Sequence, residues 1–127
     1  MARFALTLSL ALLTGATPLV AQDAPDPAWP LTLIDGQSPG FSATLSLNQP
    51  GFVRGRGPCN GYSARLTGTL PAVALGAIRS TRMACPDLAA ERAFFALLGG
   101  IDTIIATQTA LTLSGNGHVM VFAPFSE

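Results

Sequence analysis

The chain has 127 residues, of which 49% are apolar, 7% aromatic and 11% charged, and its seven arginines balance seven acids. This even charge argues against a nucleic-acid binder, which needs a basic face to neutralise phosphates. The large apolar fraction excludes an acidic disordered chain, and the length corresponds to a single domain.

The first 21 residues have the parts of a secretory signal peptide. Arg3 supplies the positive start, residues 4–13 form a short apolar core, and Ala21 is the small residue before the predicted cleavage point. A membrane anchor is the alternative, but the 18 positions of residues 4–21 include Gly and Pro, which makes a span marginal. No Cys lies near this point for lipid attachment. We therefore expect a soluble periplasmic or secreted protein with no transmembrane segment after cleavage.

Cys59 and Cys85 are the only two cysteines, and both remain after cleavage. An even pair in an exported protein is most simply a disulfide. These two residues and the lone His118 are too few for a closed zinc site, and their spacing is not that of a redox pair. Loop-closure entropy alone would give such a bridge about 3.5 kcal/mol of stability.

The first half of the mature chain reads as a polar lead-in followed by short strands. Residues 22–28 are Pro-rich and polar, and residues 29–34 form a first predicted strand that ends at a turn. Residues 41–47 alternate apolar and polar side chains, which predicts a strand with one solvent-exposed face. Residues 52–54 begin a return strand, as in a hairpin.

A Gly-rich segment at residues 55–61 holds three Gly and one Pro, so it needs unusual backbone angles or close backbone approach. It lacks the Lys-Ser/Thr that opens the helix after a phosphate-binding loop. Strands are expected on both sides of the one predicted helix, with a hairpin turn at residues 114–117. These further strands are residues 62–67, 71–82 (bulged near Gly76), 103–107, 111–113 and 118–123.

One convincing helix begins at Pro86 and ends at Gly99-Gly100. Leu88, Phe95 and Leu98 fall on one face, with Phe94 beside it. Strands, one helix and more strands predict an α+β domain at residues 29–124. We expect a small curled antiparallel sheet or partial β-barrel closed by one α-helix, with Phe94 and Phe95 in its core rather than in a ligand cavity.

No residue pattern points to catalysis. His118 stands alone at a hairpin, where an exposed role is expected. The acids are scattered, and capping or solvation explains them. No cluster has metal-ligand spacing, so we expect no enzyme activity, metal or cofactor. These acids are Asp35, Asp87, Glu91 and Asp102.

The arginines are the more interesting charged residues. Arg54 and Arg56 would face the same way on an extended strand, and Arg79 and Arg82 flank Ser80-Thr81. Arg suits bidentate contacts to carboxylate or phosphate, so a site for an anionic partner is conceivable. The alternative, which we favour from the sequence alone, is weak surface pairing with nearby acids. Those acids are Asp87, Glu91 and Asp102.

Several motifs taken together resemble the META domain, the family of the heat-shock protein HslJ. The resemblance covers residues 29–124 and is most specific in the Cys-Asn and Thr-Arg-Met-Ala-Cys segments. The matching residues are Trp29, Gly55-x-Gly57-x-Cys59-Asn60-x-Tyr62, Thr81-Arg82-Met83-Ala84-Cys85-Pro86, Glu91, Phe94-Phe95, Leu111-Thr112-Leu113 and Val121-Phe122.

The resemblance implies a small α+β fold, exported or envelope-associated, with no established enzyme activity and with links to heat shock, antibiotic tolerance and virulence. Pro58 and Ala64 depart from the family pattern, where Gly is common. We expect an interaction module of the envelope stress response whose partner is an envelope protein. The alternative is a carrier of a small hydrophobic ligand or lipid. Candidate partner contacts are Arg54, Arg56, Asn60, Tyr62 and Arg82.

Overall fold

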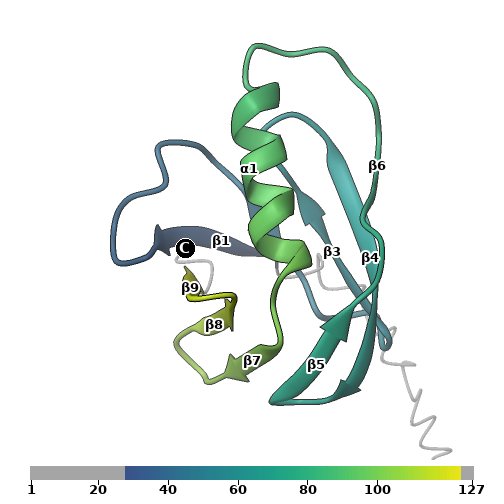
Figure 1. The fold of residues 1–127 in the computed structure, drawn as a ribbon, viewed down its shortest axis with the longest axis vertical. Helices are drawn as coiled ribbons and strands as arrows, with labels where there is room; N and C mark the ends of the chain where they lie inside the picture. Colours follow the sequence, from purple (N-terminus) through teal and green to yellow (C-terminus); the bar gives the residue numbers. More distant parts are fainter. Residues whose placement is uncertain (1–27, 124–127) are drawn as a thin grey trace, which may run out of the picture.

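The computed structural model describes residues 28–123, and these form nine strands and one helix (Figure 1). The predicted signal peptide and all of the lead-in except Ala28 lie outside the described residues. In chain order the elements are β1 Trp29–Ile34, β2 Thr44–Leu45, β3 Phe52–Arg56, β4 Gly61–Thr69, β5 Ala72–Leu75, β6 Arg79–Ser80, α1 Leu88–Gly99, β7 Thr103–Ala106, β8 Leu111–Gly115 and β9 His118–Phe122.

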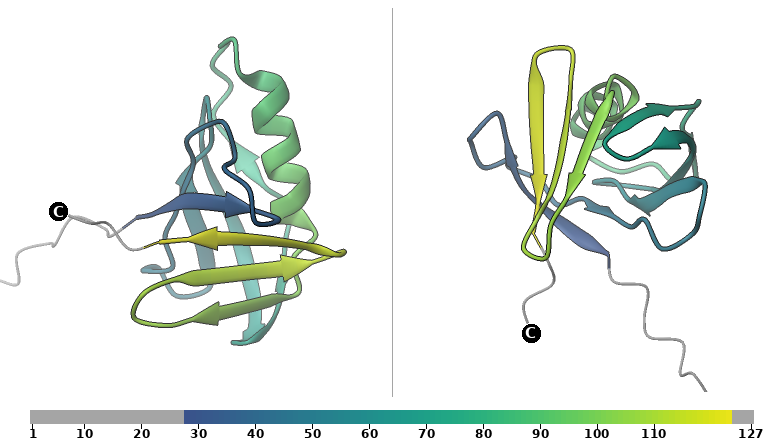
Figure 2. Two further views of the ribbon diagram at one scale, coloured as in Figure 1. Left: turned by 90° about the vertical axis from the view of Figure 1, so that its left-hand side faces the viewer. Right: turned by 90° about the horizontal axis from the view of Figure 1, so that it is seen from below.

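The strands make one antiparallel sheet in the order β2-β1-β9-β8-β7-β5-β4-β3, with β6 also paired to β4. The two ends of this order meet, because Ser46 beyond β2 and Arg54 of β3 exchange backbone hydrogen bonds of 2.6 and 3.1 Å. The β5–β7 junction is weaker, with the single pair Ala72–Thr103. The helix lies beside this β5–β7 junction, as the right-hand view of Figure 2 shows. The predicted curled sheet closed by one helix is confirmed.

Two tight turns form as their residues predict. Asp35 and Gly36 after β1 have φ of 51° and 80°, and Asn116 and Gly117 between β8 and β9 have 51° and 78°. Positive φ at both central residues is the property of the two-residue hairpin turn that follows the twist of its strands, and Asn, Asp and Gly tolerate it best. These local turns set the register of the strands around them.

The helix begins two residues later than expected, at Leu88 rather than Pro86, and ends at Gly99 as predicted. Its buried side chains are Glu91, Phe94 and Leu98, which share one face at a spacing of three and four residues. Phe94 is therefore fully buried rather than beside the core face. Within residues 28–123, no helix is long and apolar enough to cross a membrane.

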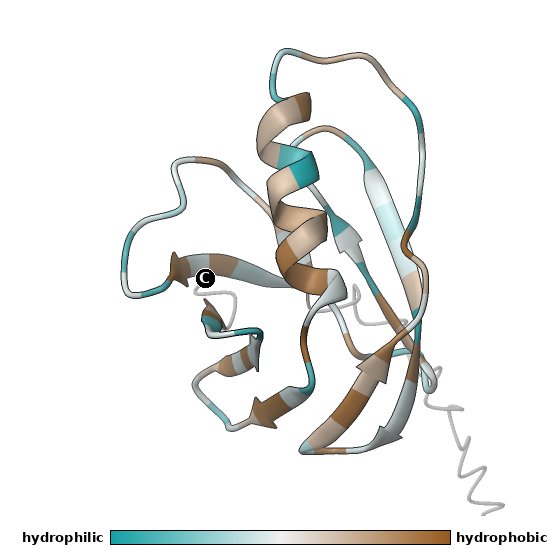
Figure 3. Cartoon of the chain, in the orientation of Figure 1, coloured by the Kyte–Doolittle hydropathy of each residue, from teal (hydrophilic) through white to brown (hydrophobic). Residues whose placement is uncertain are grey.

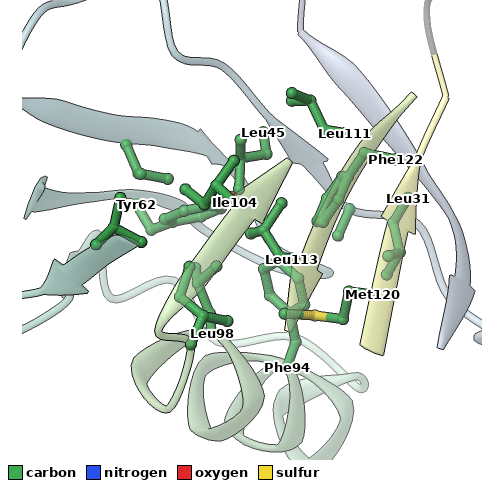
Figure 4. Close-up of a cluster of buried hydrophobic side chains, with 14 residues drawn as sticks. Leu31, Leu45, Tyr62, Phe94, Leu98, Ile104, Leu111, Leu113, Met120 and Phe122 are labelled. Carbon is green, nitrogen blue, oxygen red and sulfur yellow. The ribbon is translucent and has the colours of Figure 1, made fainter. Parts of the chain in front are cut away.

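The core lies between the helix and the concave side of the sheet. Apolar residues run along α1, β5 and β7 (Figure 3), and Figure 4 shows Phe94 and Leu98 pointing toward Leu113 and Met120. The Phe94 ring contacts Tyr62 edge-on, with centroids 5.6 Å apart, and Phe95 packs partly buried against the same cluster. The expected core role of both phenylalanines is confirmed. The interior is filled by Leu31, Leu45, Val53, Ile101, Ile104, Leu111, Leu113, Met120 and Phe122 together with the helix residues.

Two predicted strands are wrong in extent. Of residues 41–47 only Thr44–Leu45 is a strand, and Ser46, expected to face solvent, is buried at 4% exposure because it pairs with β3. The segment 71–82 divides into β5 and β6 instead of continuing with a bulge. Gly76 still donates to the Arg65 carbonyl at 2.8 Å, and the pairing to β4 resumes only at Arg79.

Candidate functional site

The Gly-rich loop is joined covalently to the segment before the helix. Cys59 and Cys85 form a disulfide across 26 residues, with Cα atoms 6.0 Å apart. The predicted pairing is confirmed. The bridge holds the loop against residues 81–85, which lie between β6 and α1 outside any helix or strand and which we call the strap. In Figure 1 the chain arches from β6 along this strap to the start of α1.

Glu91 on the helix locks the same loop through hydrogen bonds. One carboxylate oxygen accepts from the backbone N–H of Cys59 at 3.1 Å and of Asn60 at 2.7 Å, and the other from the Asn60 side-chain amide at 2.7 Å. Glu91 is only 4% exposed. The expectation that capping or solvation explains this acid is wrong, because the buried loop N–H groups need an acceptor. A Cβ at Gly57 would lie 2.7 Å from the carboxylate, so the close approach requires glycine there.

Asn60 connects the loop to the strap. Its side-chain oxygen accepts from the Met83 backbone N–H at 2.7 Å and from the Thr81 hydroxyl at 3.0 Å. Because the amide nitrogen is bound to Glu91, both ends of this buried side chain are used inside the protein. We call Cys59, Asn60, Cys85 and Glu91 the loop lock.

Three arginines gather around a groove of about 670 Å³ on the outer side of β3, β4 and β6. We call this the arginine groove; Arg54, Arg56 and Arg79 line it, and no acid among residues 28–123 does. The expected pairing with acids is wrong for the described chain, where the one ion pair joins His118 to Asp35. Glu91, one of the acids that were expected to pair with these arginines, is buried under the Gly-rich loop instead.

A second groove of about 560 Å³ lies between the strap and α1, and we call it the helix groove. Met83, Leu88 and Phe95 supply its apolar lining, and Arg82 and Arg92 bring two positive charges. The Glu91 carboxylate also borders the groove, but it is buried and bound to the Gly-rich loop. Met83 is 62% exposed, an unusual state for a large apolar side chain. Arg92 was not among the predicted contact residues, although its position four residues after Leu88 places it on the same side of the helix.

The strap also presents unpaired backbone. The Thr81 N–H donates to the Gly61 carbonyl, and the Met83 N–H donates to Asn60. The alternating residues, Arg82 and Ala84, have no backbone hydrogen-bond partner within residues 28–123. An extended segment with free N–H and C=O groups is a template for another strand.

The five candidate contact residues divide between the two grooves. Arg54, Arg56 and Tyr62 line the arginine groove, while Asn60 and Arg82 line the helix groove. Tyr62 is buried, and its hydroxyl donates to the Thr44 carbonyl at 2.6 Å. Burial raises the pKa of this phenol, so it stays protonated. Whether these residues contact a partner stays a prediction.

His118 and Asp35 form an exposed pair at the hairpin end of the sheet. The ring Nδ1 lies 2.7 Å from one Asp35 oxygen, and the other oxygen accepts from the Val119 N–H at 2.8 Å. The hydrogen bond with His118, followed by that from Val119, lowers the pKa of Asp35 below its ordinary value of 3.8. In the part of the chain that is described, no group of three His, Cys, Asp or Glu could hold a metal ion.

Comparison with known proteins supports the fold and the family. A solved structure titled "NMR structure of the protein from Burkholderia xenovorans" superimposes with a TM-score of 0.61 at 24% identity, covering 80% of this chain and 83% of that chain. At this identity the similarity concerns the fold. No curated protein matches the sequence significantly. The model of the META domain family matches residues 22–127, so the chain belongs to the META domain family, as its motifs predicted.

Proposed function

We propose that this protein is an exported, non-catalytic binding module of the cell envelope, and that it binds an extended segment of a protein partner in the helix groove. The observation that carries the proposal is the open strap edge beside an apolar and positively charged groove. The disulfide supports export, because such bridges persist in oxidising compartments. The link to stress response rests on the resemblance to the HslJ family.

Strand addition fits the geometry of the strap. Arg82 and Ala84 are two residues apart, so their free backbone groups point to the same side of the extended chain. A partner strand would pair with them through main-chain hydrogen bonds, as in other complexes formed at sheet edges. The loop lock holds the strap in position before the partner arrives, which lowers the entropy cost of binding.

The side chains of the groove select the chemistry of the partner. Leu88, Phe95 and the exposed Met83 offer apolar contacts, and Met adapts well to different surfaces. Arg82 and Arg92 form no ion pair within residues 28–123. A segment that alternates apolar side chains with Asp or Glu would satisfy both features.

The interior of the sheet supports a protein partner over a small hydrophobic ligand. A carrier needs an open apolar cavity. Here Phe94, Leu98 and Phe122 are fully buried at the centre, and the surrounding strands supply further apolar side chains to the same space. Native mass spectrometry of protein from the periplasm distinguishes the two, because a carried lipid would add mass that disappears on denaturation.

Site-directed photocrosslinking tests the proposal in living cells, with and without heat stress. A photoreactive residue replaces Met83, and a second chain carries it at Ile105, which is 51% exposed on β7. We expect a crosslinked protein from position 83 and none from position 105. Arg82→Glu and Arg92→Glu, each made singly, should strongly reduce that product, whereas Arg65→Glu, the same single charge reversal outside the groove, should leave it.

Crosslinking that is equal at positions 83 and 105, or insensitive to the Arg82 and Arg92 changes, would contradict the proposal. The non-catalytic part is tested separately by assays against ester, phosphate and peptide substrates. Turnover that disappears in His118→Ala would show an enzyme.

A further inference from the structure

The arginine groove has a defined geometry that the protein-binding proposal does not use. Arg54 on β3 pairs directly with Ser63 on β4, and Ser63 pairs with Arg79 on β6. Residues directly opposite one another on neighbouring strands share a face of the sheet. Arg56 lies two residues after Arg54 and opposite Gly61, so it joins the same face. Three long cationic side chains therefore surround a floor of small residues.

Strand spacing places the three charges close enough for one ligand. Neighbouring strands lie ~4.8 Å apart, so Arg54 and Arg79 start ~10 Å apart across Ser63. Arg54 and Arg56, two residues apart along β3, are separated by ~6.6 Å. An Arg side chain is long enough to bring its guanidinium from either side over Ser63. Because Gly61 has no side chain, it leaves space for a ligand at the base of the groove.

The positive charge of the groove is not compensated by the described protein. No Asp or Glu lines it, and none of its three arginines forms an ion pair within residues 28–123. Arg54 donates to the neutral side chain of Gln49 at 3.1 Å, which orients its guanidinium without neutralising it. Guanidinium groups stay charged at any physiological pH. Such a site attracts an anion that carries more than one charge.

We propose that the arginine groove binds a phosphomonoester group. A dianionic phosphate offers three acceptor oxygens, which match several guanidinium forks better than a single carboxylate does. The Ser63 hydroxyl at the floor supplies a further donor. Among the described residues, Tyr62 is the one aromatic side chain in the lining, and it is buried and offers no face for a nucleobase. This favours a phosphate carried by a sugar or a lipid headgroup over a nucleotide.

The test uses the disulfide-bonded protein labelled with ¹⁵N and titrated at low salt with glucose 6-phosphate, with glucose as the uncharged control. We expect amide shifts centred on Ser63, Gly61 and Arg54, no response to glucose, and weaker binding as salt is added. Arg54→Gln and Arg79→Gln should each weaken affinity about tenfold. Arg92→Gln, which removes one charge from the helix groove instead, should have little effect.

A second arm separates the two sources of phosphate by flotation with phosphatidylcholine vesicles that contain phosphatidic acid. Binding to these vesicles that is stronger than to glucose 6-phosphate indicates a lipid headgroup, and the reverse indicates a soluble sugar phosphate. Either result supports the proposal if it depends on Arg54 and Arg79. Absence of binding in both arms, or equal losses in Arg92→Gln, would overturn it. The crosslinking at Met83 is independent of this outcome.

Discussion

Two carboxylates join distant parts of this chain, and they do so in opposite environments. Glu91 lies under the Gly-rich loop at 4% exposure and accepts hydrogen bonds from Cys59 and Asn60. Asp35 lies at the hairpin end of the sheet, where its side chain is 45% exposed and is shared by His118 and the Val119 N–H. Both acids bring together segments that are far apart in sequence.

Burial, rather than the number of hydrogen bonds, decides how much such a link contributes to stability. A buried donor that loses its acceptor costs roughly 1–3 kcal/mol, because no water replaces the lost partner. An exposed ion pair is replaced by water when it breaks and contributes little. The end with the loop lock should therefore control stability, and the Asp35–His118 end should respond mainly to pH.

Glu91→Ala is expected to have the largest effect. It leaves the buried N–H groups of Cys59 and Asn60 without an acceptor and removes one of the two hydrogen bonds of the Asn60 amide nitrogen, which should lower the free energy of unfolding by about 4 kcal/mol. For a domain of this size the melting temperature should fall by roughly 20 °C. Circular dichroism during heating measures the change.

The matched control is Asp87→Ala, which removes an exposed acid at the start of the same helix. Asp87 makes no side-chain capping hydrogen bond, so we expect a shift of at most a few degrees. Similar losses in both variants would show that Glu91 acts as a helix-terminal charge rather than as the acceptor of the loop lock.

Breaking the disulfide tests the covalent part of the loop lock. Reduction, or Cys85→Ser, should remove about 3.5 kcal/mol by loop entropy and lower the melting temperature by roughly 10 °C or more. The double change Glu91→Ala with Cys85→Ser tests whether the hydrogen-bonded and covalent links stabilise the same unit. If both links hold one unit, the combined loss should be smaller than the sum of the single losses. An unchanged melting temperature on reduction would mean that the bridge adds nothing to stability.

The smallest effect concerns Asp35, and it depends on pH. Because the hydrogen bonds of the folded protein lower the pKa of Asp35 below 3.8, its stabilising contribution is present above that value and is lost as the pH falls through the lower, folded pKa. In His118→Ala the pKa of Asp35 should rise but stay lowered, since the Val119 N–H still donates. NMR titration of the carboxyl carbon measures both. An Asp35 pKa that His118→Ala leaves unchanged would contradict the interpretation.

Features that depend on neighbouring residues were predictable from the sequence. Asp35-Gly36 and Asn116-Gly117 form tight turns because few other residues tolerate their backbone angles. The helix ends at Gly99 as expected, but of the three residues predicted for its core face only Leu98 is buried, because the face is turned toward Glu91 and Phe94. The even cysteine pair, combined with the predicted export, indicated the disulfide.

Features that depend on partners far away in the chain were not predictable. The alternation in residues 41–47 predicted an exposed Ser46, yet its pairing with Arg54 closes the sheet and buries it. Glu91 looked like an ordinary acid near a helix start, because nothing local shows that loop donors 31 residues earlier need an acceptor. The arginines were expected to meet those same acids.

The turns, the helix and the class of fold follow from residues close together in the chain, since backbone preferences and apolar spacing act over a few residues, and the family follows from the motifs. Which charges are compensated depends instead on contacts between distant parts of the chain. The fold places Glu91 inside the loop lock and gathers Arg54, Arg56 and Arg79 on an outer face where no acid of the described residues lies. Electrostatic environment depends on distance in space and on burial, and strand pairing sets both.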